Sequence, residues 1–227
     1  MLTLLTATGC RPLAWEISEK LAIRQTFSDP VRWIIVDDGK QAQPITFKKT
    51  NWELVVVRPQ PYWQFGQNTQ ARNLAEGMKL ISENDRVVVW EDDDSYHPDW
   101  LVTVDHWLNK ADLVCEKRAR YYNVRTKKYR QLQNDQHASL CCTAMKGKAI
   151  QAFVKELKAG VQFIDINLWK HFGGSRALYD SKMVVGIKGT PGRNGIGMGH
   201  KNDFQGKIDL DGSILRQWTN TNADLYI

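Results

Sequence analysis

The sequence has no apolar run approaching the roughly 20 residues that a membrane-spanning helix requires. Its first uncharged stretch, residues 1–10, lacks the basic leader and the length of a signal peptide, so we expect no export. The cysteines have no CxxC spacing; they are Cys10, Cys115, Cys141 and Cys142. This spacing argues against zinc ligands and favours reduced thiols in a cytoplasmic protein with no integral membrane segment.

The composition is that of an ordinary globular domain. Of 227 residues, 42% are hydrophobic and 25% are charged, which excludes a mainly disordered, collagen-like or coiled-coil chain. We see no repeat and no linker, so we expect a single domain over residues 1–227. Two features depart from the average, a net charge of +6 and nine Trp residues. The positive surplus favours a polyanionic partner without identifying it.

Two hydrophobic periods alternate in the N-terminal part of the chain. All-apolar runs predict buried strands at residues 2–8, 33–36, 54–57 and 87–90. Four-residue spacing predicts helices from Pro12 and over residues 70–82. After residue 101 the pattern changes, with β-type segments at 112–131 and 139–145, a helix at 147–160, and a Gly- and Asn-rich tail from residue 186 that we expect to form a flexible loop. This alternation predicts an α/β fold with a mostly parallel central sheet and a mixed second half.

Polar clusters follow three of the predicted strands, at residues 6–11, 37–38 and 91–94. In an open parallel sheet, ligands bind at the carboxyl ends of the strands. The third cluster consists of four adjacent acids, which repel one another unless a cation neutralises them. Carboxylates without thiolates suit Mg²⁺ or Mn²⁺ bridging substrate phosphates. The alternative is an acidic loop that caps a helix beginning near Pro98.

Segments that occur in a fixed order resemble family 2 GT-A glycosyltransferases. They are residues 6–12 (TATGCRP), 25–27 (QTF) with 36–39 (VDDG), 71–73 (ARN), and 91–94 (EDDD) followed by His97 and Pro98. The resemblance covers residues 1–101, and it implies a Rossmann-like GT-A domain with a nucleotide-sugar-binding half there and an acceptor half at 102–227. It also implies a nucleotide-sugar donor, for which we favour a UDP-sugar, and a Mn²⁺ or Mg²⁺ ion on its diphosphate.

The resemblance also assigns candidate residues. The donor-binding candidates are Thr6, Thr8, Arg11, Asp38, Arg72, Glu91, Asp92 and Arg193. Asp38 is expected at the base, and the arginines are expected to hold the diphosphate, although a surface role is the alternative for each arginine. The usual D-x-D pattern begins with Asp, whereas here Glu91 stands first, so Asp93 is the expected metal ligand and Asp94 its competitor. His200, in the glycine-rich segment 191–200, resembles a late metal-binding His; an incidental His is the alternative.

Asp165 is the candidate catalytic base. The segment 160–169 resembles the later acidic segment of such enzymes, where a carboxylate activates the acceptor hydroxyl. Apolar neighbours would raise the pKa of Asp165 into a useful range. A helix N-cap is the alternative, and whether transfer is inverting or retaining stays open.

The segment 117–130 contains seven cations and three tyrosines, a pattern that suits phosphate contacts with ring stacking. We assign Arg120, Tyr121, Tyr122 and Arg125 to an acceptor site, with a solvated hairpin as the alternative. The acceptor is then expected to be a hydroxymethylated pyrimidine in double-stranded DNA, and the chain to be phage-encoded and active in the host cytoplasm. The alternatives are a cell-surface glycan or lipid-linked acceptor, and a nucleotidyltransferase that shares the acidic metal site.

Overall fold

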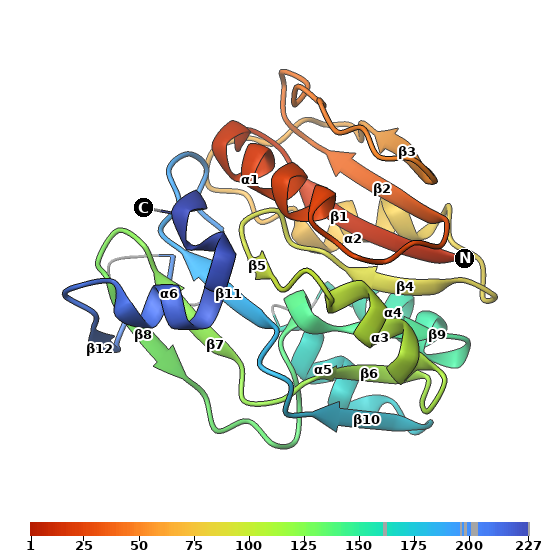
Figure 1. Cartoon of the computed structure of the whole chain (residues 1–227). Coiled ribbons are helices and arrows are strands. Elements are labelled where there is room, and N and C mark those ends of the chain that lie inside the picture. The colour runs from red at the N-terminus through yellow and green to blue at the C-terminus, as the bar shows by residue number, and fades with distance from the viewer. Residues whose placement is uncertain (161–162, 196, 198, 201–203, 227) are drawn as a thin grey trace.

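The computed structural model describes residues 1–160, 163–195, 197, 199–200 and 204–226. The predicted segments 160–169 and 191–200 therefore lie partly outside the described residues. Two sheets run through the molecule and lie next to each other, and most of the helices pack around the larger one (Figure 1).

The larger sheet carries all of the predicted N-terminal strands. Its strands are β1 (Leu2–Thr8), β2 (Val31–Asp37), β3 (Trp52–Val57), β4 (Arg86–Val89), β6 (Leu113–Glu116), β9 (Ala144–Lys146) and β10 (Arg176–Tyr179), in the order β10-β6-β9-β4-β1-β2-β3. The strands β1 to β4 pair in parallel, whereas β9 runs antiparallel to both β4 and β6. The expected fold class, mostly parallel with a mixed second half, is confirmed.

The smaller sheet has the order β12-β8-β7-β11-β5. Its strands are β5 (Ser95–Tyr96), β7 (Arg120–Asn123), β8 (Lys128–Gln131), β11 (Val184–Lys188) and β12 (Lys207–Ile208). β5 follows directly on the acidic run after β4, so this run lies where the two sheets meet. The two expected halves are interleaved, because β6, β9 and β10 complete the larger sheet and β5 joins the smaller one.

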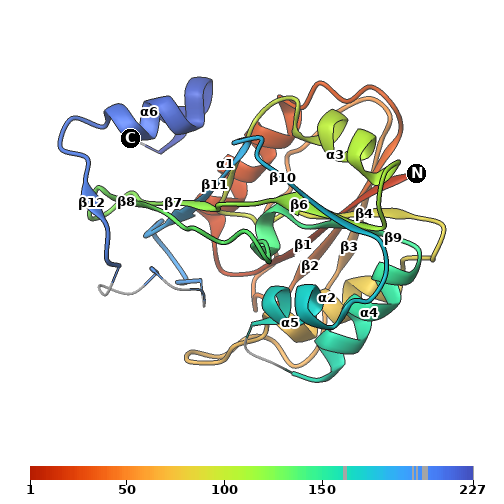
Figure 2. The same cartoon turned by 90° about the horizontal axis from the view of Figure 1, so that it is seen from below.

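Helices cover both faces of the larger sheet. Figure 2 shows α1 (Pro12–Ile23) and α3 (Trp100–Leu108) on one face, and α2 (Gln70–Met78), α4 (Lys148–Lys158) and α5 (Ile164–His171) on the other. The C-terminal part adds α6 (Ser213–Thr219) and the 3₁₀ segment η2 (Asn220–Leu225). In the described part of the chain, no helix is long and apolar enough to cross a membrane.

The tryptophan surplus fills the core. Trp15, Trp33, Trp90, Trp100 and Trp169 are fully buried, and Trp33 lies 5.1 Å from Trp15 between ring centroids. Such large rings bury much apolar surface, which accounts for most of the excess without a ligand that stacks on them.

Two predicted segments differ from the structure. Residues 139–145 were expected to form one strand, but Leu140–Cys142 forms a 3₁₀ turn (η1), because the Ser139 carbonyl accepts hydrogen bonds from the Cys142 N–H and the Thr143 hydroxyl. The tail from residue 186 was expected to lack regular structure, yet β11 and α6 lie there. Gly186 is required in β11 because a Cβ at this position would lie 2.4 Å from the Tyr121 ring of β7.

Candidate active site

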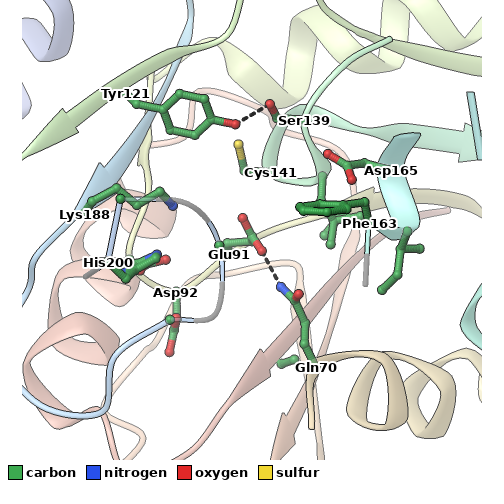
Figure 3. Close-up of a pocket in the computed structure, with 18 of the residues that line it drawn as sticks. Gln70, Glu91, Asp92, Tyr121, Ser139, Cys141, Phe163, Asp165, Lys188 and His200 are labelled. Carbon is green, nitrogen blue, oxygen red and sulfur yellow. Dashed lines mark hydrogen bonds and ion pairs between the residues drawn. The ribbon is translucent and has the colours of Figure 1, made fainter. Parts of the chain in front are cut away.

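A cavity of about 430 Å³ lies at the carboxyl end of β4 (Figure 3). The acidic run forms part of its wall, together with Tyr121 of β7, Lys188 of β11 and the start of α5. The run does not cap α3, because β5 intervenes and Asp99 is the N-cap residue of that helix. The alternative interpretation of the four acids as a helix cap is therefore wrong.

Arg11 binds two of the acids. Its guanidinium donates hydrogen bonds to Asp92 and, at 2.5 Å, to Asp93 Oδ2, while the Thr8 hydroxyl donates to Asp92 Oδ2 at 2.6 Å. Burial alone would lower the pKa of Arg11, but the charges of Asp92 and Asp93 outweigh it and raise that pKa. Burial raises the pKa of Asp92 to about 6 despite Arg11, whereas the pKa of Asp93 is lowered, because Arg11, Lys188 and His200 together overcome its burial.

Glu91 and Asp94 lie on the other side of the run. Glu91 Oε1 accepts a hydrogen bond from Gln70 Nε2 at 2.5 Å, and Asp94 Oδ1 accepts one from the Ile187 N–H at 2.7 Å. Among the described residues, Asp94 Oδ2 is buried without a hydrogen-bond partner. The ligand atoms of Glu91, Asp94 and Cys141 all lie within 4.8 Å of one another. Burial raises the pKa of Glu91 and of Asp94.

His200 lies beside Asp93, with 3.8 Å between His200 Nε2 and Asp93 Oδ2. Both side chains are buried. Burial, followed by the charge of Lys188, lowers the pKa of His200 to about 3, so the imidazole is neutral at pH 7. Gly195 packs against this ring, since a Cβ there would lie 2.5 Å from Nε2. A neutral imidazole and an anionic carboxylate at this spacing are groups that suit a shared divalent cation.

Asp38 is completely buried, and other side chains occupy both of its oxygens. It accepts hydrogen bonds from Arg193 Nη1 at 2.6 Å, Arg72 Nη2 at 3.2 Å and the Thr69 hydroxyl at 2.5 Å. The Arg193 guanidinium also lies 4.4 Å from the centre of the Trp63 ring. The structure thus brings Asp38, Arg72 and Arg193 together beside the main cavity, where both arginines pair with Asp38.

Asp165 and Phe163 form the wall opposite Lys188 and His200, with Glu91 between them (Figure 3). Asp165 lies in the first turn of α5, whose N-cap residue is Phe163. Burial raises the pKa of Asp165, and the nearby His137 partly opposes this shift. Phe163 is 45% exposed and lines the cavity. A carboxylate and an exposed aromatic ring therefore face the acids across the cavity.

No family model and no curated protein matches the chain. Among solved structures, S. aureus TarS 1–349 superimposes with a TM-score of 0.52 at 11% sequence identity, over 82% of this chain and 60% of the TarS chain. The complex of TarS 1–349 with UDP gives a TM-score of 0.53 over the same fractions, and the complex with UDP-GlcNAc gives 0.54 over 90% of this chain and 62% of that one, both at 11% identity. The chain has a GT-A glycosyltransferase fold. It spans less than two thirds of the length of these TarS chains.

Within this GT-A fold, Thr6 is not at the cavity. Its hydroxyl donates to the Trp90 carbonyl at 2.7 Å and accepts from Trp33 Nε1 at 2.9 Å, and the side chain is fully buried. The prediction that Thr6 contacts the donor is therefore wrong, because its side chain packs in the core.

The four acceptor candidates do not form one surface of the GT-A domain. Arg120 is 5% exposed, donates to the Val184 carbonyl at 3.2 Å and lies 5.6 Å from the centre of the Trp218 ring. Tyr122 is buried, and its hydroxyl donates to Asp209 at 3.0 Å. Successive side chains of β7 point to opposite faces, so only Tyr121 lines the cavity, where its hydroxyl lies 2.5 Å from the Ser139 hydroxyl. Arg125 is exposed.

Lys188 and Gln70 are among the cavity residues that sequence reasoning missed. Lys188 ends β11, within a tail that was interpreted as a loop. The apolar run Val184–Lys188 is itself a short strand pattern that ends at a charged residue, and it could have indicated a site residue at a strand end.

Proposed function

We propose that this chain is a glycosyltransferase that moves a sugar from a UDP-sugar to an acceptor hydroxyl. The supporting observation is the buried acidic run at the carboxyl end of β4, which faces Asp165 across a cavity. The fold adds support, because TarS, which shares it, has been solved with UDP and with UDP-GlcNAc. Thr8 and Arg11 hold Asp92 in place at the donor end of this cavity.

For the metal we propose Mn²⁺ or Mg²⁺, held by Asp93 and His200. The fit of this pair rests on its burial, the neutral imidazole and the 3.8 Å between His200 Nε2 and Asp93 Oδ2. Asp93 Oδ2 also accepts a hydrogen bond from Arg11, so an ion there would bind beside this guanidinium or displace it. Asp94 is the alternative carboxylate, since its Oδ2 has no hydrogen-bond partner among the described residues. Such an ion, when bound, neutralises charge that develops on the diphosphate leaving group.

Asp165 is proposed to accept the proton of the acceptor hydroxyl. Its raised pKa makes it a stronger base than an exposed Asp, and its place opposite the acids puts the acceptor across the cavity from the diphosphate. The exposed ring of Phe163 offers a face on which an acceptor ring can stack.

The proposal is tested with a panel of nucleotides and nucleotide sugars in Mn²⁺, Mg²⁺ or EDTA. We expect UDP and a UDP-sugar to bind in calorimetry. Without an acceptor, we expect slow transfer of the sugar to water, which releases the free sugar and nucleoside diphosphate. We expect Asp93→Asn to lose the metal-dependent part of the affinity, and the exposed control Asp29→Asn to keep it. Pyrophosphate release would instead identify a nucleotidyltransferase, and failure of UDP and every nucleotide sugar to bind would contradict the proposal.

Asp165→Asn should reduce turnover by a factor of about 10² or more while leaving UDP affinity unchanged, because general base catalysis contributes about that much. Steady-state kinetics with any active donor, compared with Asp29→Asn, measures the effect. Retained turnover would remove Asp165 from the mechanism.

For the acceptor, a hydroxymethylated pyrimidine in double-stranded DNA stays our proposal, now supported only by the exposed cations Arg125, Lys127 and Arg130 of segment 117–130. DNA binding through these side chains should weaken steeply as salt rises. Transfer assays with hydroxymethylated duplexes and with glycans, run side by side, separate the two acceptor classes. Binding to duplex that does not respond to salt, or transfer to glycans alone, would contradict the DNA acceptor.

A further inference from the structure

Lys188 carries an ammonium group that is buried in the wall of the cavity. The residue is 6% exposed and ends β11. Its stem packs against Gly199, where a Cβ would lie 3.4 Å from Lys188 Cγ, and its Nζ lies 5.4 Å from the centre of the Tyr121 ring. Figure 3 shows the nitrogen pointing into the cavity, between His200 and Cys141.

The ammonium of Lys188 has few partners among the described residues. An ammonium has three N–H donors, but among the described residues none accepts a hydrogen bond from Lys188 Nζ. The nearest carboxylate oxygen is Asp94 Oδ1, at 3.7 Å, and that oxygen already accepts from the Ile187 N–H. A buried charge without hydrogen bonds is costly, so a ligand that supplies acceptors at this position would lower that cost.

The other cations of the cavity are in a different situation. Arg11 donates to Asp92 and Asp93, which uses its charge within the protein. Arg130 is exposed to solvent. Arg11 keeps one buried donor without a partner, its Nε, whereas no described residue accepts a hydrogen bond from any of the three donors of Lys188. Lys188 also stands next to the carboxylates beside which an anionic ligand must bind.

We propose that Lys188 binds the diphosphate of the nucleotide-sugar donor directly and stabilises it as a leaving group. This inference rests on the proposed function. A fixed N–H donor in a buried site is already oriented toward the charge that develops as the glycosidic bond breaks, so it needs no rearrangement. Part of the diphosphate affinity then comes from the chain itself and persists without a metal ion.

The test measures the affinities of UDP and of uridine in EDTA, by calorimetry for UDP and by competition for uridine. Lys188→Met should weaken UDP binding tenfold or more, because a charge-assisted hydrogen bond is lost, and should leave uridine binding unchanged. Lys188→Arg should keep most of the UDP affinity. Lys207→Met, an exposed lysine of the same sheet, is the matched control and should bind UDP like the wild type.

A second variant separates ligand binding from a purely structural ion pair. Lys188→Met leaves Asp94 without its nearby cation, whereas combining it with Asp94→Asn restores the charge balance and should restore the thermal unfolding temperature. The proposal expects UDP affinity to stay weak in this double variant; recovery of UDP affinity would overturn it. Wild-type affinity in Lys188→Met, or an equal loss for uridine, would overturn it as well. If the wild-type chain binds no UDP with or without Mn²⁺, the proposed function itself fails.

Discussion

Adjacent acids in the run from Glu91 to Asp94 differ in pKa because each meets different neighbours. Asp93 faces Arg11 and His200, and its pKa is lowered, whereas burial raises the pKa of Glu91, Asp92 and Asp94. The run therefore does not act as four equal charges at neutral pH. This difference depends on side-chain partners far away in the sequence, so the spacing of the motif alone leaves the metal-binding acid undecided.

Two threonines of β1 provide a matched test of buried hydroxyl groups. Thr6→Val removes the partner of both Trp33 Nε1 and the Trp90 carbonyl, so the free energy of unfolding should fall by about 1–3 kcal/mol. Thr3 is equally buried, but among the described residues its hydroxyl has no partner, so Thr3→Val should be neutral or stabilising. Urea denaturation measures both changes.

UDP affinity distinguishes the core role of Thr6 from the donor role expected from its sequence. Thr6→Val should bind UDP as the wild type does. A loss of UDP affinity at unchanged stability would restore Thr6 as a donor contact.

Sequence reasoning named several of the charged residues that line the cavity but not their partners. The acids, Arg11, His200 and Asp165 were placed near one another because their segments follow predicted strands or match a motif. Lys188 was missed because the short strand pattern that it ends was interpreted as part of a flexible tail. Arg120 was misplaced because neighbouring positions on a strand point to opposite faces, and the sequence does not show which face is covered.

At the scale of elements, the strands β1 to β4 were predictable because buried parallel strands are continuous apolar runs. The segment 139–145 was not, since the Ser139 carbonyl and the Thr143 hydroxyl close a turn that apolar composition cannot reveal. The predicted helix 70–82 ends at Met78, ahead of the turn that leads to β4. Gly186 of β11 was expected to make the chain flexible, whereas in the structure it lets β11 approach the Tyr121 ring closely.

Gly77 sets how closely α2 approaches the sheet. A Cβ at this position would lie 2.3 Å from Leu5 Cδ1 and 3.0 Å from Val36 Cγ2. Gly77→Ala gains about 1 kcal/mol of helix propensity but overpacks the core by about 1–3 kcal/mol, so we expect a net loss of stability. Thermal unfolding measures it, with Gly173→Ala as the control because nothing lies within 4 Å of a Cβ there. A higher unfolding temperature for Gly77→Ala would contradict this packing.

At the scale of the whole molecule, the net charge of +6 does not show that the acidic and the basic side chains gather in different places. The acids concentrate at the cavity, where Arg11 and Lys188 partly neutralise them. The cations of segment 117–130 are divided between the interior and the surface, so this part of the chain presents a smaller basic surface than its composition indicates.

The C-terminal segment η2 forms hydrogen bonds with residues of the N-terminal half of the chain. Asn222 is buried, donates to the Tyr96 carbonyl at 2.9 Å and accepts a hydrogen bond from Arg24 at 2.7 Å. Asn222→Ala leaves the buried Tyr96 carbonyl without its donor, so the free energy of unfolding should fall by about 1–3 kcal/mol. Asp224→Ala, exposed in the same 3₁₀ segment, is the control. Equal denaturation midpoints for the two variants would show that this connection contributes nothing.

Asp38 is completely buried, and Arg193 occupies the position that a ligand of the Asp38 carboxylate would take. A nucleotide base can reach the Asp38 carboxylate only after Arg193, which is 155 positions away in the sequence, has left it. The observed affinity for any ligand that uses Asp38 is then the intrinsic affinity multiplied by the fraction of molecules in which the guanidinium has withdrawn. Such a ligand therefore binds more weakly than its contacts with Asp38 alone would allow, because the ion pair between Arg193 and Asp38 must break first.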